Sequence, residues 1–148
     1  MTSLVVDASV WVAAADPSDP FCQPSRAFLE AIAGREVPVA LPAYAQVEVA
    51  CALARRKQNA EVGRTLAAGL FAAPTVEVHA LDSGLLEQAV HRGTHASLRA
   101  GDALYAALAE RVEGQLVSWD GELTERAHAV TPETWLGENP AGSPGVAR

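Results

Sequence analysis

Short apolar segments alternate with helical patterns along this chain. The segments LVV (4–6), PVAL (38–41), TVEVHAL (75–81) and QLVSWD (115–120) have the composition of strands. Helical spacing is found at 25–33, 43–56, 60–73, 82–92, 102–109 and 122–127. The resulting order, β-α-β-α-α-β-α-α-β-α, predicts an α/β fold in which helices cover both faces of a mostly parallel central sheet.

The length and composition indicate one folded domain. A chain of 148 residues can close one hydrophobic core, and 49% hydrophobic with 20% charged residues is typical of globular proteins. We expect the domain to cover 1–136. The remaining segment, 137–148, is rich in glycine and proline and is expected to be a flexible tail.

The sequence shows no sign of export or membrane insertion. No uninterrupted apolar run approaches the roughly 18 residues that cross a bilayer, and no basic segment precedes the first apolar stretch. We therefore expect a cytoplasmic protein without a membrane partner. Cys22 and Cys51 provide neither a disulfide framework nor a metal-binding spacing, and the apolar pattern around Cys51 predicts a core position.

Four acidic residues interrupt stretches that otherwise resemble a protein core. Asp7 follows the apolar strand LVV, and Asp120 ends the strand segment QLVSWD. Because the carboxyl ends of parallel strands face the ligand crevice of an open α/β sheet, these two acids should share one edge. Asp102 opens the helix DALYAALA, and Glu48 lies in the middle of the helix at 43–56.

Each acid also has a simpler explanation. Asp102 would serve as a helix cap, Asp120 as a turn residue, and Glu48 as the partner of an arginine on a solvated face. Asp7 is the hardest to explain in this way, because both sides of it are apolar. Taken together, the four positions favour a shared site.

Carboxylates that meet at one sheet edge would repel each other, and burying them unpaired costs several kcal/mol each. A divalent cation would remove that cost, and oxygen donors without a His or Cys cluster favour Mg²⁺ or Mn²⁺ over zinc. The net charge of −7 argues against a polynucleotide partner, but one such ion changes it to −5 and two change it to −3. A metal-activated water attacks phosphorus, so the expected substrate is a phosphodiester.

Four segments carry a resemblance to a known family. VVDASVWV, QVEVACALARR, RAGDALYAALA and LVSWDGELTERA are similar in order and spacing to the four acidic motifs of the PIN domain, and the chain resembles its VapC-type toxin ribonucleases. The resemblance covers 3–136, since VTPETWL (130–136) also looks like the last strand and end of that family. It implies a three-layer α/β/α fold and a metal-dependent endoribonuclease that hydrolyses RNA.

The resemblance also implies a site and partners. Ser9 would occupy the family's hydroxyl position and orient a neighbouring carboxylate, and Ser118 stands where the family usually has threonine. The expected partners are RNA, a VapB-type antitoxin whose tail reaches the acidic pocket, and a second copy of the chain in a homodimer. The acids that would hold Mg²⁺ or Mn²⁺ and serve catalysis are Asp7, Glu48, Asp102 and Asp120.

The fourth motif departs from the family pattern. An aromatic residue usually follows its acid, whereas here Gly121 and Glu122 follow Asp120. Glu122 is either a fifth acid of the site or simply the start of the helix ELTERA, where an acid favours the helix dipole. The second explanation is preferred.

Other polar and aromatic residues carry weaker signals. The four histidines, at 79, 91, 95 and 128, show no spacing that suggests a metal role. Trp119, beside Asp120, is a candidate for the rim of the site, whereas Trp11 is expected in the core or at a dimer interface. Six basic residues are candidates for phosphate contacts: Arg55, Arg56, Lys57, Arg64, Arg92 and Arg99.

Two other functions fit parts of the pattern. A phosphatase of the haloacid dehalogenase type also begins with a strand and an aspartate, but its chemistry needs a second aspartate where this chain has Ser9. Such enzymes also use a lysine, and Lys57 is the single lysine here. A non-catalytic PIN-like module that binds RNA or protein is disfavoured by the acids at all four motif positions.

Overall fold

The computed structural model describes residues 2–141. Four parallel strands form the sheet: β1 (Leu4–Val6), β2 (Val39–Pro42), β3 (Val76–His79) and β4 (Gln115–Val117). They lie in the order β3-β2-β1-β4, so the first strand of the chain pairs with the last. In that pair Val6 lies opposite Val117, which brings the residues following both strands to one edge.

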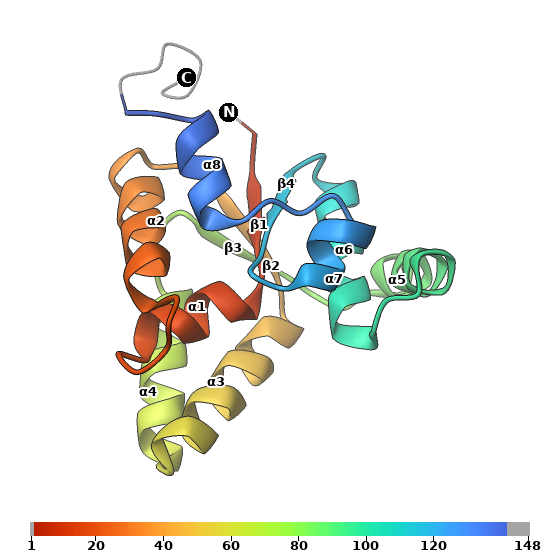
Figure 1. Cartoon of the computed structure of the whole chain (residues 1–148). Coiled ribbons are helices and arrows are strands. Elements are labelled where there is room, and N and C mark those ends of the chain that lie inside the picture. Colours follow the sequence, from red (N-terminus) through yellow and green to blue (C-terminus); the bar gives the residue numbers. More distant parts are fainter. Residues whose placement is uncertain (1, 142–148) are drawn as a thin grey trace.

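Helices form the layers on either side of the sheet (Figure 1). Figure 1 shows the sheet with α1 and α2 on one side and α5 and α6 on the other, while α3 and α4 extend together from one end. This arrangement confirms the predicted three-layer α/β/α fold. The helices are α1 (Ala8–Ala15), α2 (Cys22–Gly34), α3 (Tyr44–Lys57), α4 (Ala60–Phe71), α5 (Ser83–Ala96), α6 (Ala100–Arg111), α7 (Gly121–Arg126) and α8 (Pro132–Glu138).

The core lies between the sheet and its two helical layers. The three residues of β1 are all buried, and α6 packs against β1, β2 and β4 with an unbroken buried run, 103–109. On the other side, Phe28 of α2 is fully buried and its ring meets that of Trp135 of α8 edge-on. Burial around almost the whole of α6 explains why its sequence lacks a polar face.

The structure contains two helices that the sequence patterns did not predict. Residues 8–15 form α1, of which five are buried, and a helix that is apolar on all sides shows no periodicity. The second is α8, which begins with Pro132 after a cap from Thr131. The expected final strand at 130–136 is reduced to a single parallel bridge between Val130 and Val117.

The sequence predicted a core position for Cys51 and a core or dimer-interface position for Trp11, and of the two the structure buries Trp11. Cys51 is exposed, so the prediction that it belongs to the core is wrong; it occupies the outer side of α3, while Val49 and Leu53 of the same helix are buried. Trp11 is a core residue, 5% exposed, and its indole N–H donates to the backbone oxygen of Val6 at 2.9 Å.

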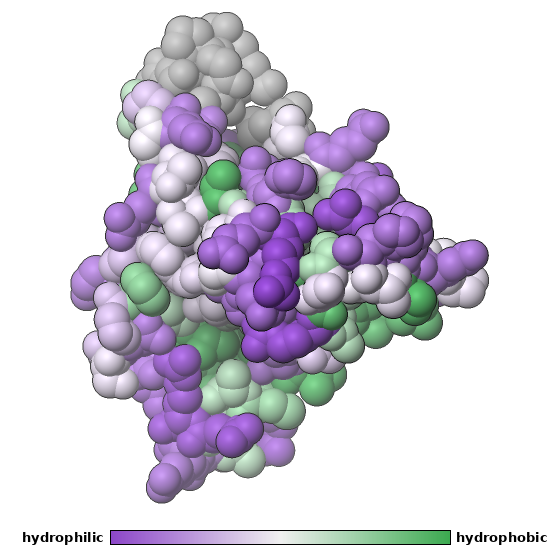
Figure 2. Space-filling model, turned by 45° about the vertical axis from the view of Figure 1, so that its right-hand side comes forward, coloured by the Kyte–Doolittle hydropathy of each residue, from purple (hydrophilic) through white to green (hydrophobic). Residues whose placement is uncertain are grey.

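The face of the molecule seen in Figure 2 is largely polar. Most of the face seen in Figure 2 is hydrophilic or neutral, with hydrophobic residues in separate small areas. Within 2–141, no helix combines the length and the apolar character needed to cross a membrane. The predicted tail starts inside α8, which continues to Glu138, and its residues 142–148 lie outside the described part of the chain.

Candidate active site

A polar cleft of about 300 Å³ lies beyond the carboxyl ends of β1 and β4. All four predicted acids line it, although they come from distant parts of the sequence. Asp7 and Asp120 follow the two strands, Glu48 comes from α3, and Asp102 comes from the first turn of α6. The remaining lining residues are Ala8, Ser9, Tyr44, Arg99 and Gly101.

Asp7 occupies the most buried position of the four. It is the N-cap of α1, and its Oδ2 accepts a hydrogen bond from the backbone N–H of Ser9 at 3.3 Å. Only 5% of the residue is exposed, and this burial raises the pKa of its carboxyl, against the opposing effect of nearby hydroxyl and N–H donors. The backbone therefore fixes this carboxylate in a place where a negative charge is poorly solvated.

Two serine hydroxyls connect the first and last strands beside Asp7. The Ser118 hydroxyl is buried, donates to Asp7 Oδ2 at 2.7 Å and accepts from the backbone N–H of Asp120 at 2.9 Å. The Ser9 hydroxyl lies 3.4 Å from that of Ser118 and accepts from the backbone N–H of Trp119 at 3.1 Å. These bonds hold the turn after β4 against the start of α1, so the positions of Asp7 and Asp120 depend on each other.

Glu48 reaches the cleft from α3, and among residues 2–141 its side-chain partner there is a tyrosine rather than an arginine. Its Oε1 accepts a hydrogen bond of 2.7 Å from the hydroxyl of Tyr105, a fully buried residue of α6. Burial raises the pKa of the Glu48 carboxyl, the Tyr105 hydrogen bond lowers it, and the negative charges of Asp7 and Asp102 raise it again. Tyr105 therefore orients the Glu48 carboxylate. The four acidic motifs did not point to this tyrosine. Its position three residues after Asp102 on one helix was the available signal.

The other acids lie nearer the mouth of the cleft. Asp120 caps α7, with its Oδ1 accepting from the backbone N–H of Glu122 at 2.8 Å. Asp102 is not a cap, since Arg99 holds the N-cap position of α6. Carboxylate oxygens of Asp102, Asp120 and Glu122 lie within 4.8 Å of one another, so Glu122 both opens a helix and joins the acidic group.

Arg99 spans this outer group of acids. Its Nε donates to Asp102 Oδ2 at 3.0 Å, its Nη2 donates to Asp120 Oδ2 at 2.6 Å, and Nε lies 3.6 Å from Glu122 Oε2. Burial raises the pKa of Asp102, and the Arg99 guanidinium opposes that rise. The sequence identified Arg99 only as one of six basic residues without a specific partner.

The donor set suits a hard divalent cation. Every side chain that could ligate an ion in this cleft offers oxygen, with no cysteine or histidine among its lining residues. The pKa values of Asp7, Glu48 and Asp102 are all raised, with burial the largest cause in each. Their negative charges are therefore incompletely compensated by the protein, and a bound divalent cation would supply the missing positive charge.

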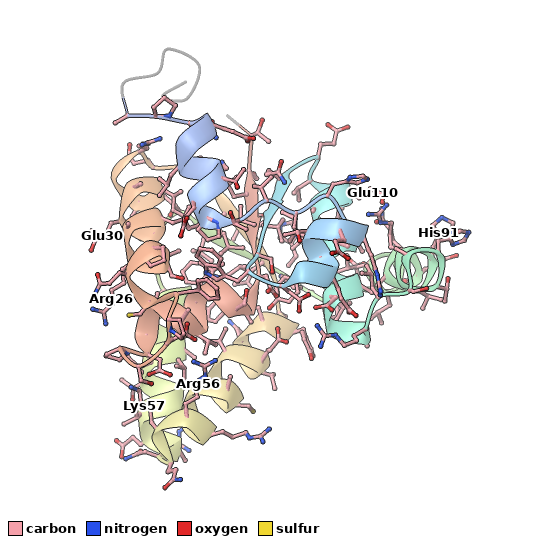
Figure 3. The ribbon with its side chains drawn as sticks, in the orientation of Figure 1. Arg26, Glu30, Arg56, Lys57, His91 and Glu110 are labelled. Carbon is pink, nitrogen blue, oxygen red and sulfur yellow. The ribbon has the colours of Figure 1, made fainter. Side chains whose placement is uncertain are left out.

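Several predicted contributors lie elsewhere. Trp119 does not line the cleft: its ring stacks on that of Phe21 at 4.2 Å between centroids, and its indole N–H donates to Ser25 Oγ at 2.8 Å. Arg56, labelled on α3 in Figure 3, pairs with Asp16 at 2.9 Å and with a second aspartate in the loop before α2. Of the six basic candidates, Arg99 is the one found among the residues lining the cleft.

The histidines are also outside the cleft. His91 lies on the outer side of α5 in Figure 3, one helical turn before His95, and their ring centroids are 4.2 Å apart. These two histidines are therefore neighbours on one helix face, a spacing that the sequence analysis did not single out. His79 lies near Glu77 on β3, with 3.3 Å between Nε2 and Oε1.

The chain matches the family model described as the PIN domain over residues 4–129. A search of curated proteins finds no match. Several solved structures share the fold, and 24 chains match in total.

Three of these structures illustrate the similarity. The sarcin–ricin loop-cleaving toxin VapC20 of Mycobacterium tuberculosis is 21% identical, with 82% of this chain and 93% of that chain covered and a TM-score of 0.69. A toxin–antitoxin complex from Klebsiella pneumoniae is 17% identical, with 87% of this chain and 97% of that chain covered and a TM-score of 0.64. VapBC2 of Rickettsia felis, bound to a DNA fragment from its promoter, is 13% identical, with 87% of this chain and 96% of that chain covered and a TM-score of 0.66. At these identities the similarity establishes the common fold.

Proposed function

The chain belongs to the PIN domain family, and on this premise we propose that it is a metal-dependent endoribonuclease of the VapC toxin type. The observation that carries the proposal is the convergence of Asp7, Glu48, Asp102 and Asp120 on one cleft at the carboxyl edge of the sheet. Three of these carboxyls have raised pKa values, so the protein alone does not compensate their charge. Acids that only stabilised the fold would not need to be buried at this cost in free energy.

We assign the four acids as ligands of Mg²⁺ or Mn²⁺, with Glu122 as a further carboxylate at the mouth of the cleft. Such an ion, when bound, lowers the pKa of a water and offsets negative charge on a phosphodiester. Ser118 and Ser9 hold Asp7 in place, and Tyr105 holds Glu48, so both inner carboxylates are oriented before any ion binds.

The partners follow from the related structures. Two of them contain a VapBC pair or another toxin–antitoxin complex, and we propose that a VapB-type antitoxin binds this chain and blocks the cleft. We also propose that the chain forms a homodimer. We propose a cytoplasmic location, where the protein would encounter both RNA and such an antitoxin. An acidic cleft offers an antitoxin an obvious target for a basic side chain.

The decisive experiment is RNA cleavage with a matched pair of variants. The wild-type protein with Mn²⁺ or Mg²⁺ should cut a structured RNA, and D7N should lose at least about a hundredfold of that activity, the scale expected when a metal ligand or its charge is removed. D82N is the control, because Asp82 is also a helix N-cap but pairs with Arg111 at 2.9 Å outside the cleft. Cleavage by D82N but not by D7N supports the proposal.

The alternative is a non-catalytic PIN-like module. If wild type, D7N and D82N are all equally inactive on total RNA with either metal, the nuclease assignment is wrong and the binding module is favoured. Cleavage that persists in a chelator would instead contradict the role of the metal.

A further inference from the structure

Arg99 is the basic residue among those that line the cleft. The partners of its guanidinium are three acids. Its guanidinium contacts Asp102, Asp120 and Glu122, the three residues whose carboxylate oxygens lie within 4.8 Å of one another. These are the positions from which a divalent ion would take oxygen ligands at the mouth of the cleft. A guanidinium and a divalent cation therefore compete for the same lone pairs.

The inner and outer acids are stabilised in different ways. Asp7 and Glu48 receive hydrogen bonds from hydroxyls of Ser118 and Tyr105, both buried, and these neutral donors leave the carboxylates charged and able to ligate a metal. The outer acids receive a full positive charge from Arg99 instead. Removal of that charge is required before a cation can approach them closely, because like charges at such distances repel.

Arg99 is free to move away. Its side chain is 68% exposed, compared with 13% for Asp102 and 25% for Asp120. It belongs to the residue that caps α6, at the mouth of the cleft, so the guanidinium can turn outward without disturbing the core. Because the guanidinium itself faces solvent, water can replace these contacts when the side chain turns outward.

From this geometry we propose that Arg99 is an internal counter-cation of the site, displaced from Asp102 and Asp120 when a divalent ion binds. Once displaced, its planar fork of donors faces the entrance of the cleft, where it binds the phosphate of the RNA being cut. This role rests on the proposed nuclease function, but its first part concerns only the metal. Arg99 thus links metal binding to the recognition of substrate.

The first test measures metal binding without RNA. Mn²⁺ affinity is determined by electron paramagnetic resonance for wild type, R99Q and R126Q. The control is chosen because Arg126 also lies near Glu122, at 3.5 Å, but does not line the cleft. R99Q should bind Mn²⁺ about fivefold more tightly or better, whereas R126Q should change the affinity by less than about twofold. Equal tightening in both variants would reveal a general charge effect and overturn the displacement.

The second test follows the guanidinium itself. The ¹H–¹⁵N resonance of Arg99 Nε, assigned by its loss in R99Q, should move to the position of a solvent-exposed arginine when Mg²⁺ is added. The corresponding resonance of Arg111, which pairs with Asp82 outside the cleft, should stay in place. Mg²⁺ binding without movement of the Arg99 resonance would overturn the proposal even if the affinities agree.

RNA cleavage separates this inference from the proposed function. If the metal displaces Arg99 but no RNA is cut, the nuclease assignment fails and the counter-cation role stands. If RNA is cut, R99Q should raise KM for RNA several-fold despite its tighter Mn²⁺ binding, and an unchanged KM would refute the phosphate contact. If no variant binds Mn²⁺, both proposals fail together.

Discussion

Asp7 is held in place at a cost to the fold. Its carboxyl is almost fully buried, and burial raises its pKa above the usual 3.8. Well below pH 3.8 the group is protonated in both the folded and the unfolded chain, so it imposes no penalty. As the pH rises, the unfolded chain ionises first, and the folded state loses stability until its own pKa is passed. At neutral pH the unfolded chain is ionised at this position, so the penalty is present.

The variant D7N should therefore be more stable than wild type at pH 7. Asparagine keeps the N-cap and can still accept from Ser118, but carries no charge. In chelator, Tm should rise by about 3–6 °C, given about 2–4 °C per kcal/mol for a domain of this size. The gain should shrink as the pH approaches 4, as measured by thermal unfolding across a pH series. A constant or lower Tm at every pH would contradict the burial argument.

Tyr105 tunes Glu48, and Y105F tests this directly. The variant keeps the buried ring but removes the donor 2.7 Å from Glu48 Oε1. The hydrogen bond lowers the pKa of Glu48, so its loss raises that pKa further and lets protons compete better with a metal. Mn²⁺ affinity should fall about threefold to tenfold at pH 6 and less at pH 8.

The control for this prediction is Y44F. Tyr44 lines the same cleft, but its hydroxyl makes no hydrogen bond to Glu48 within the described structure. Equal losses in Y44F and Y105F would show that a general change in the cleft, rather than the bond to Glu48, controls the affinity.

At the level of elements, α3 is anchored by close contact with α4. A Cβ added to Gly63 of α4 would lie 2.6 Å from the backbone oxygen of Ala50 and 2.7 Å from Ala54 Cβ. Since the obstructing atoms belong to the backbone and a Cβ of α3, neither can yield without moving the helix. The position of Glu48 thus depends on a glycine in another helix.

The pair G63A and G69A should give opposite results. G63A should destabilise the protein by about 1–3 kcal/mol through overpacking. A Cβ added to Gly69 would meet no neighbour within 4 Å, so G69A should stabilise α4 by about 0.5–1 kcal/mol. Urea unfolding of both variants checks this, and destabilisation by both would indicate that the helix, not its contact with α3, is sensitive.

Helices with one apolar face are the ones that periodicity predicts most directly, although α6, which is buried on almost all sides, was also predicted at 102–109. The helices at 25–33 and 82–92 bury one side, so their periodicity is visible, whereas α1 is buried on most sides and merges with β1 into one apolar run. The four acids could be predicted because a charged residue stands out within an otherwise apolar stretch of sequence. The positions of Trp119 and Arg99 were not, because each depends on a tertiary contact with another element.

At the scale of the whole molecule, a bound cation should act as a stabiliser. The chain carries a net charge of −7, and the described cleft concentrates several of its acids. Mn²⁺ at a hundred times its Kd adds about 2.7 kcal/mol, which raises Tm by about 5–10 °C. The shift should be reversed by chelator, absent in D102N and retained in D82N, as followed by scanning calorimetry. A shift of equal size in D102N would place the ion elsewhere.

The pairing of β1 with β4 also has a consequence during protein synthesis. Asp7 leaves the ribosome early, but Asp120 and the Ser118 hydroxyl that holds Asp7 arrive only with the last strand, which must insert beside the first. A growing or truncated chain therefore contains three of the acids without a working site. If the folded protein cuts RNA, the ribosome that makes it is exposed to that activity only after β4 and Asp120 have been synthesised.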